Sequence, residues 1–139
     1  MNAMLLAHAS SAVQWHAALA LAGLLLGCVQ MMRPKGTHIH RWLGRAWVLA
    51  MLLVAVSSFW IRGLMPNTLA WGFSPIHLLS IFVIVQLARA IYFARIGNIA
   101  RHSGIMKGVF WGGLVIAGSF TLIPGRLMFE VFLAPLFAA

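Results

Sequence analysis

Two apolar runs of membrane-spanning length meet at the stretch Gly36-Thr-His-Ile-His-Arg-Trp-Leu-Gly-Arg45. This stretch places two histidines and two arginines where the second run begins. A looser version follows as Gly97-Asn-Ile-Ala-Arg-His-Ser-Gly-Ile-Met-Lys107, where a glycine and a histidine beside arginine again precede an apolar run. The pattern predicts two copies of one repeated helical hairpin.

The composition is that of a polytopic membrane protein. Of the 139 residues 63% are apolar and only 8% are charged, which is too little polar surface to cover a water-soluble globule. The net charge of +9 would favour nucleic acid in a soluble domain, but here the cations cluster in the connections. We therefore assign them to membrane topology and to contacts with anionic lipid, and expect no nucleic-acid partner. The lone Cys28 excludes a disulfide framework and a thiolate metal cluster.

The apolar runs predict an all-α fold, a bundle of four transmembrane helices that forms a single domain over residues 1–139. The expected helices cover residues 11–32, 40–61, 75–96 and 100–122. For the third helix, Ser74 before Pro75 is a typical capped start. The tail 126–139 is apolar with one glutamate, and its conformation is left open.

Positive charge predicts the orientation of the four helices. Eight cations fall on one side of the predicted membrane and two, Arg62 and Arg126, on the other. The eight are Arg33, Lys35, Arg41, Arg45, Arg89, Arg95, Arg101 and Lys107. Because cytoplasmic connections carry an excess of Lys and Arg, both termini are expected outside, on the periplasmic side of a bacterial inner membrane.

Each expected helix carries one histidine, and an imidazole in hydrocarbon is costly enough to be a functional candidate. His16 and His77 lie near the outer ends of the first and third helices, and His40 and His102 near the inner ends of the second and fourth. The separation within a hairpin is 24 residues in the first and 25 in the second. If like helices lie on a diagonal of the bundle, two imidazoles face each other at each membrane side.

Paired imidazoles in a helical bundle suit b-type haem, which needs an axial nitrogen on each side of the iron and apolar walls. We therefore expect one or two haem b groups, with His16, His77, His40 and His102 as metal ligands. Gly23 and Gly27 share the helix face of His16 and form a small flat surface. That surface either leaves room for a flat ligand or allows close helix packing.

Basic residues at the rim would meet the haem propionates. Lys35, Arg41 and Arg101 are the candidates on the inner side, and Arg62 or Arg126 on the outer side. The two irons would lie on the order of 20 Å apart at the rise of an α-helix, so the pair would carry electrons across the membrane. Enzymatic activity as a transmembrane oxidoreductase is left open.

Other interpretations of the histidines remain. A histidine at a helix end also caps, snorkels or binds lipid. His8 and His38 have no counterparts in the other hairpin. We expect them either to lie at the membrane interface or to have an auxiliary role in electron transfer, for example near a quinone. Zinc would have too few ligands, and copper held with methionine help stays open. Proton pumping is disfavoured because no expected helix carries an acid in mid-membrane.

A different class of function is a haem-free accessory subunit of a larger membrane complex. Gly104, Gly108 and Gly112 form a second small-residue ridge, and such ridges pack helices closely. The ridges and the basic loops would dock on the partner subunits. A small-molecule carrier is disfavoured, because the helices are not broken in mid-membrane.

Several motifs resemble those of a family of bacterial membrane proteins catalogued as domain of unknown function 2306. They are His40-Arg-Trp-Leu-Gly-Arg45, Ser74-Pro-Ile-His-Leu-Leu-Ser80, Ala100-Arg-His102 and Gly112-Gly-Leu-Val-Ile-Ala-Gly118. The chain departs from the family at Ser103, where arginine is more usual. Its helix count and histidine pattern are also similar to the two-haem cytochrome b superfamily. That similarity implies electron exchange with a quinone or a redox partner protein.

Overall fold

The computed structural model describes residues 3–61 and 75–137, and every regular element in these two ranges is helical. Four helical segments there are long and apolar enough to cross a membrane: Ser11–Met32, His38–Trp60, Ile76–Arg95 and Ile99–Leu122. The predicted all-α membrane fold is therefore confirmed. Arg62 and Ser74, which carried sequence-based expectations, lie outside the described residues.

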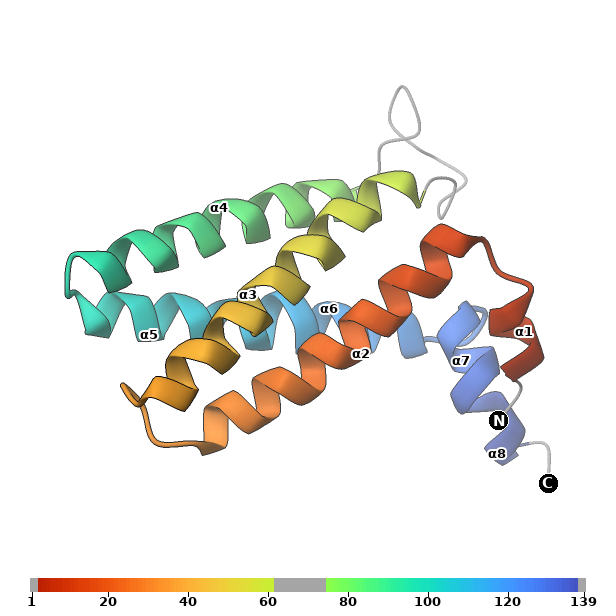
Figure 1. Ribbon diagram of the computed structural model, residues 1–139. Coiled ribbons are helices and arrows are strands. Elements are labelled where there is room, and N and C mark those ends of the chain that lie inside the picture. The colour runs from red at the N-terminus through yellow and green to blue at the C-terminus, as the bar shows by residue number, and fades with distance from the viewer. Residues whose placement is uncertain (1–2, 62–74, 138–139) are drawn as a thin grey trace.

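The first two spans form a tight hairpin (Figure 1). The first span is α2 (Ser11–Met32), and the second is α3 (His38–Ser57), which continues as the short 3₁₀ helix η1 (Ser58–Trp60). Helix α3 begins two residues before the expected position. The reason is a local cap, since the Thr37 hydroxyl oxygen accepts a hydrogen bond from the His40 backbone N–H at 3.1 Å.

The third span is α4 (Pro75–Arg95), and the fourth differs from the expected regular helix. It starts as α5 (Ile99–Gly108) and widens into the π-helix η3 (Val109–Ile116). It then ends as α6 (Ala117–Ser119) and the 3₁₀ helix η4 (Phe120–Leu122). An eight-residue π-helix is unusual, because such turns mostly occur singly inside α-helices.

The two hairpin turns share one local structure. Gly36 and Gly97 both have a positive φ, 80° and 77°, which glycine adopts without a steric penalty. The next residue in each turn caps the following helix. Thr37 does so for α3, and the Asn98 side-chain oxygen accepts from the Arg101 backbone N–H at 3.2 Å. The glycines that begin both versions of the motif therefore close the two turns.

The chain ends lie at the end of the bundle opposite to the two hairpin turns (Figure 1). Before the first span lies α1 (Ala3–Ala7), and after the fourth come α7 (Leu127–Phe132) and α8 (Ala134–Phe137). Helix α7 contacts α1. The tail that sequence analysis left open is thus helical and folds back against the start of the chain.

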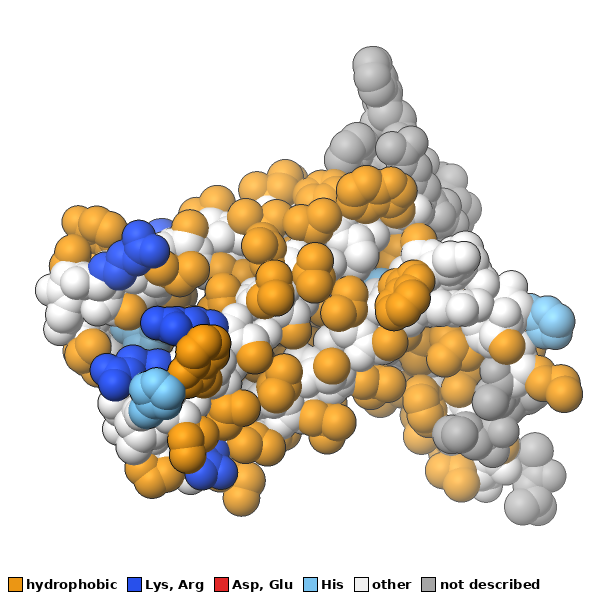
Figure 2. Space-filling view, in the orientation of Figure 1, with side chains coloured by type: hydrophobic (Ala, Val, Ile, Leu, Met, Phe, Trp, Pro, Cys, Tyr) orange, Lys and Arg blue, Asp and Glu red, His pale blue; other side chains and the backbone are white. Residues whose placement is uncertain are grey.

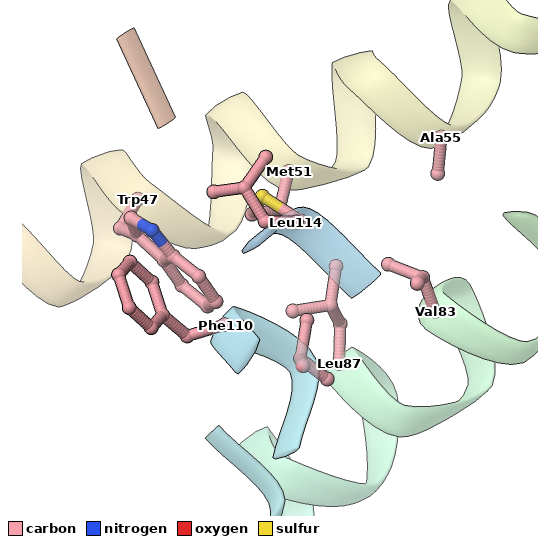
Figure 3. Close-up of a cluster of buried hydrophobic side chains, with 8 residues drawn as sticks. Trp47, Met51, Ala55, Val83, Leu87, Phe110 and Leu114 are labelled. Atoms are coloured by element: carbon pink, nitrogen blue, oxygen red, sulfur yellow. The ribbon is translucent and has the colours of Figure 1, made fainter. Parts of the chain in front are cut away.

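The four spans pack in a ring. Helix α2 contacts α3, α3 contacts α4, α4 contacts α5 and η3, and η3 returns to α2. Helices α2 and α4 therefore lie on one diagonal, and α3 and the fourth span on the other. The core between them is a cluster of buried apolar side chains (Figure 3), namely Trp47, Met51, Ala55, Val83, Leu87, Val109, Phe110 and Leu114.

The outside of the bundle is apolar over the length of the spans, and Figure 2 shows its Lys and Arg side chains gathered at one end. Large side chains such as Leu25, Leu78 and Phe82 are exposed there. Surfaces of this kind are rare on soluble monomers, and lipid is the medium that they fit. The charged end is the one that holds the two hairpin turns.

Candidate functional site

The predicted histidines lie in two polar clusters, one near each end of the bundle. The terminal-end cluster consists of His16, Ser57, Ser58, His77 and Ser80, at the end where the chain termini lie. The turn-end cluster consists of Gln30, His40 and His102, next to the hairpin turns. Each cluster joins residues from helices that are distant in sequence.

In the terminal-end cluster, His16 is hydrogen-bonded to the second span. The His16 Nδ1 lies 2.9 Å from the Ser57 hydroxyl oxygen. That hydroxyl also lies 3.0 Å from the Val54 carbonyl oxygen, so its one hydrogen has two acceptors within reach. When the hydroxyl donates to Val54, its oxygen accepts from the His16 Nδ1, and Nε2 of the neutral ring has the lone pair that a metal ligand requires.

The same cluster continues across α3 to α4. The Ser58 hydroxyl donates to the Ala55 carbonyl oxygen at 2.7 Å and lies 2.6 Å from the Ser80 hydroxyl, which completes a buried polar link between the two helices. One turn before Ser80, His77 is only 3% exposed. Its ring packs against Phe59 with centroids 5.5 Å apart. His16 thus contacts Ser57 at the end of α3, and His77 contacts Phe59 in the adjoining η1.

In the turn-end cluster, the hydrogen bond of His102 indicates which ring nitrogen carries its proton. Its Nδ1 lies 2.9 Å from the carbonyl oxygen of Ala90 on α4. A carbonyl only accepts, so Nδ1 carries the proton and Nε2 of the neutral ring keeps its lone pair. A backbone carbonyl behind Nδ1 is a common partner of metal-binding histidines.

His40 has the opposite form. The Gln30 amide nitrogen donates to the His40 carbonyl oxygen and to its Nδ1, both at 2.8 Å. The carbonyl requires a donor, so it is the amide nitrogen that faces the ring, and Nδ1 accepts. The neutral His40 ring therefore carries its proton on Nε2. His40 and His102 are close enough to interact electrostatically, which places both in one cluster.

The glycine face of α2 is filled by side chains. A Cβ at Gly27 would lie 2.5 Å from Phe110 and 2.7 Å from the Trp47 indole nitrogen, and one at Gly23 would lie 3.4 Å from the Met51 sulfur. Trp47 and Phe110 lie against each other here (Figure 3). Of the two interpretations of this face, close packing describes the structure, and the glycines provide no open surface for a flat ligand.

The predicted rim residues take different positions. The Lys35 ammonium donates to the carbonyl oxygens of Gln30, Met31 and Arg33 at 2.7, 2.7 and 2.9 Å, so its three hydrogens cap the end of α2. Arg41 is exposed at the start of α3. The Arg101 guanidinium lies 5.2 Å from the centroid of the Phe93 ring. Of these three predicted rim residues, Lys35 caps a helix end and the two arginines do not.

The space beside the turn-end cluster is small. A cavity of about 30 Å³ is lined by Gly27, Gln30, Met31, Trp47, Met106 and Phe110. That volume holds a water molecule and is far below that of a porphyrin. Among the described residues, no group of three or more His, Cys, Asp or Glu side chains is placed to bind a metal ion. This space does not fit a haem, and the bundle would have to open to admit one.

Sequence reasoning missed the polar partners of the histidines. These partners are polar residues within otherwise apolar spans, namely Gln30, Ser57, Ser58 and Ser80. Their polarity at apolar positions is the only feature of the sequence that could have indicated them. Nothing in the one-dimensional pattern pairs Ser57 with His16, which is 41 residues away.

A ring of four membrane-length helices, apolar on the outside and basic at one end, defines an integral membrane protein with several spans. The chain belongs to the family described as predicted membrane protein (DUF2306), whose family model matches residues 13–134. The resemblance drawn from the motifs is confirmed for this family. No curated protein and no solved structure matches the chain.

Proposed function

We propose that this protein is a b-type cytochrome-like electron-transfer protein of a bacterial inner membrane, with a bis-histidine haem site in each polar cluster. One observation carries the proposal: each cluster contains an imidazole whose Nδ1 is hydrogen-bonded to the protein, His16 to Ser57 and His102 to Ala90. A neutral ring that donates from Nδ1 keeps its lone pair on Nε2, where an axial ligand needs it.

The helix arrangement supports the pairing. His16 and His77 come from α2 and α4, the members of one diagonal, and His40 and His102 come from α3 and α5 on the other. When bound, a haem supplies a centre that gains and loses one electron. The chain's own residues would hold it by the ring nitrogens, and hydrogen bonds at Nδ1 make those nitrogens stronger donors. Arg41 and Arg101, which are exposed near the starts of α3 and α5, would be the candidates to meet propionates at the turn end.

The distribution of charge supports the orientation that goes with this function. The hairpin turns carry most of the cations, so they would face the cytoplasm and the termini the periplasm. Haems at the two ends would then connect a donor on one side of the membrane with an acceptor on the other. A quinone or a redox protein is the partner class that such an arrangement serves.

A second candidate is a haem-free accessory subunit, and one observation favours it. A Cβ added at Gly104, Gly108 or Gly112 would meet nothing within 4 Å. Among the described residues, this ridge is therefore not used for packing. Small-residue ridges allow close approach of another membrane helix, so the ridge is available to a partner subunit.

The absorption spectrum of the purified protein tests the proposal. Reduction with dithionite should give the sharp α and β bands of a low-spin b-type haem. His16→Ala and His77→Ala should remove the same spectral component, and His40→Ala and His102→Ala the other. As controls, His8→Ala and His38→Ala should keep the full spectrum. A folded, colourless protein would refute haem binding and favour the accessory role, and so would four cluster variants that all retain the wild-type spectrum.

A further inference from the structure

One side of α3 carries a row of exposed residues that changes from polar to apolar along the helix. At about 100° per residue, the members of this row fall within about 60° of one another around the helix axis. The α3 row consists of His38, Trp42, Arg45, Leu49 and Val56, all of them exposed. The row begins at the turn end of the bundle and runs along the outer surface, where lipid is the surrounding medium.

The first three members of the α3 row contact one another. The Trp42 indole N–H donates to the His38 Nε2 at 3.1 Å. The Arg45 guanidinium lies over the same indole, 5.2 Å from the ring centroid, which is within the range of a cation–π contact. The Arg45 side chain therefore points back along α3 toward the turn end. This is the direction in which an arginine inside a span reaches the membrane surface.

The charge of Arg45 has no acidic side chain to pair with. The chain contains a single acidic residue, Glu130, and it lies in α7 at the other end of the bundle (Figure 1). Charged residues within membrane spans mostly face the interior of a bundle, which in α3 is the side of the buried Trp47 and Met51. Arg45 lies on the exposed side instead. A negatively charged group at the bilayer surface is therefore the partner that suits this position.

The apolar members of the α3 row indicate what kind of anion fits. Leu49 follows Arg45 by about one helical turn and is 57% exposed, and Val56 continues the row along the span. A phospholipid has its phosphate at the bilayer surface and its acyl chains beside such an apolar strip. A free phosphate ion would gain nothing from these two side chains. Figure 2 shows basic and histidine side chains next to large hydrophobic ones at the turn end.

We propose that the α3 row binds an anionic phospholipid of the leaflet at the turn end. The Arg45 guanidinium donates to the lipid phosphate, for which its planar fork of N–H groups is well suited. Trp42 holds the guanidinium, His38 is a positioning residue for the indole, and Leu49 contacts an acyl chain. This is one defined site, in addition to the general attraction of the basic end for anionic lipid. None of its residues belongs to the two polar clusters, so the site is independent of haem binding.

Native mass spectrometry of the purified protein, titrated with phosphatidylglycerol in detergent, measures the affinity of this site. Arg45→Gln should lower that affinity about fivefold, the effect typical of one cation near an anionic lipid. Arg45→Lys keeps the charge but loses the planar fork, so its affinity should also fall. Phosphatidylcholine, which has a phosphate but no net charge, should bind more weakly than phosphatidylglycerol. The substituted side chain is exposed, so the apolar core stays intact in both variants.

Arg89→Gln is the matched control. Arg89 lies six residues before the end of α4, as Arg45 lies seven residues after the start of α3, and it donates to the Gln86 side-chain oxygen at 3.0 Å. The variant removes the same charge at a similar depth, and its affinity should stay closer to that of the wild type. If Arg45→Gln and Arg89→Gln lower the affinity equally, general charge attraction explains the binding and the proposed site is refuted.

Two further results would also overturn the proposal. If Arg45→Lys binds phosphatidylglycerol as tightly as the wild type, the guanidinium and its contact with Trp42 do not form the site. An excess of inorganic phosphate should leave the lipid bound. If it displaces the lipid, the site binds a phosphate ion, and the apolar part of the row has no role in it.

A second measurement locates the lipid. Phosphatidylglycerol with a photoreactive diazirine in its acyl chain, mixed into phosphatidylcholine vesicles that contain the protein, should label residues 46–56 on irradiation. That labelling should fall in Arg45→Gln and persist in Arg89→Gln. Labelling of residues 46–56 that is unchanged in Arg45→Gln would show that the lipid is not held by the arginine, and it would refute the proposed site.

Discussion

The indole nitrogen of Trp47 donates to the carbonyl oxygen of Gly23 at 2.9 Å, inside the contact between α2 and α3. One turn further along α2, Gly27 faces the same indole and the ring of Phe110. The large side chains of two other spans therefore fit against the face of α2 where the two glycines have no side chain. This contact explains why both glycines are buried, and it leads to the first prediction.

Gly27→Ala should destabilise the bundle, because the new methyl group would lie 2.5 Å from Phe110 and 2.7 Å from the Trp47 indole nitrogen. Overpacking of this kind costs about 1–3 kcal/mol. Unfolding in mixed detergent micelles, followed by tryptophan fluorescence, measures the change. Gly104→Ala is the control, because its methyl group would meet nothing within 4 Å. Equal stability of the two variants would refute the packing role of Gly27.

Gly113→Ala should be destabilising for a related reason, at the contact between the π-helix η3 and α4. The added Cβ would lie 2.9 Å from a methyl carbon of Val83, a stiff side chain that has little freedom to move. We expect a cost of about 1–3 kcal/mol in the unfolding free energy. The double variant with Val83→Ala should recover part of that cost. If the two costs simply add, the proximity of Gly113 and Val83 is not the cause.

The hydrogen bond between His16 and Ser57 should appear as a coupling in a double-mutant cycle of His16→Ala and Ser57→Ala. Interhelical hydrogen bonds in membrane proteins average about 0.6 kcal/mol, and we expect a coupling of that size in the unfolding free energy. The control cycle pairs His16→Ala with Ser119→Ala, because Ser119 donates to Ile116 in its own span. If the coupling energy is no larger than in the control cycle, the hydrogen bond between His16 and Ser57 does not stabilise the fold.

The proposed orientation is testable by cysteine labelling. In a Cys28→Ala background, Pro34→Cys and Ile96→Cys place thiols at the two hairpin turns, and Ser10→Cys places one at the other end of the bundle. A membrane-impermeant maleimide added to intact cells, with their outer membrane permeabilised, should label position 10 and spare positions 34 and 96. If the two turns are labelled and position 10 is not, the topology is the reverse of the proposed one.

The spans themselves were predictable from sequence. Apolar length, turn glycines and clustered cations are local properties, and the structure places α2 at the residues expected for the first span and positive φ values at Gly36 and Gly97. The expected start at His40 was late by two residues, because the Thr37 cap depends on a single side-chain hydrogen bond. The π-helix was not foreseen, since its pattern of apolar and small residues is also that of an ordinary helix.

The site was predictable only in part. The four histidines of the two clusters could be predicted from the sequence, although the second span also contains His38, because it begins at that residue. The role of Lys35 could not, because its ammonium serves the end of α2 rather than a ligand. The role of Gln30 was equally hidden, since it depends on the distance between its amide and His40.

By itself, the sequence determined a four-span helical membrane protein, because hydrophobic length and charge bias act on each segment separately. The tertiary structure decided the hydrogen-bond partners of His16, His40 and His102, and hence which ring nitrogen of His40 and His102 holds the proton. The physical reason is that a hydrogen bond depends on distances of a few tenths of an ångström between helices, which only their packing sets.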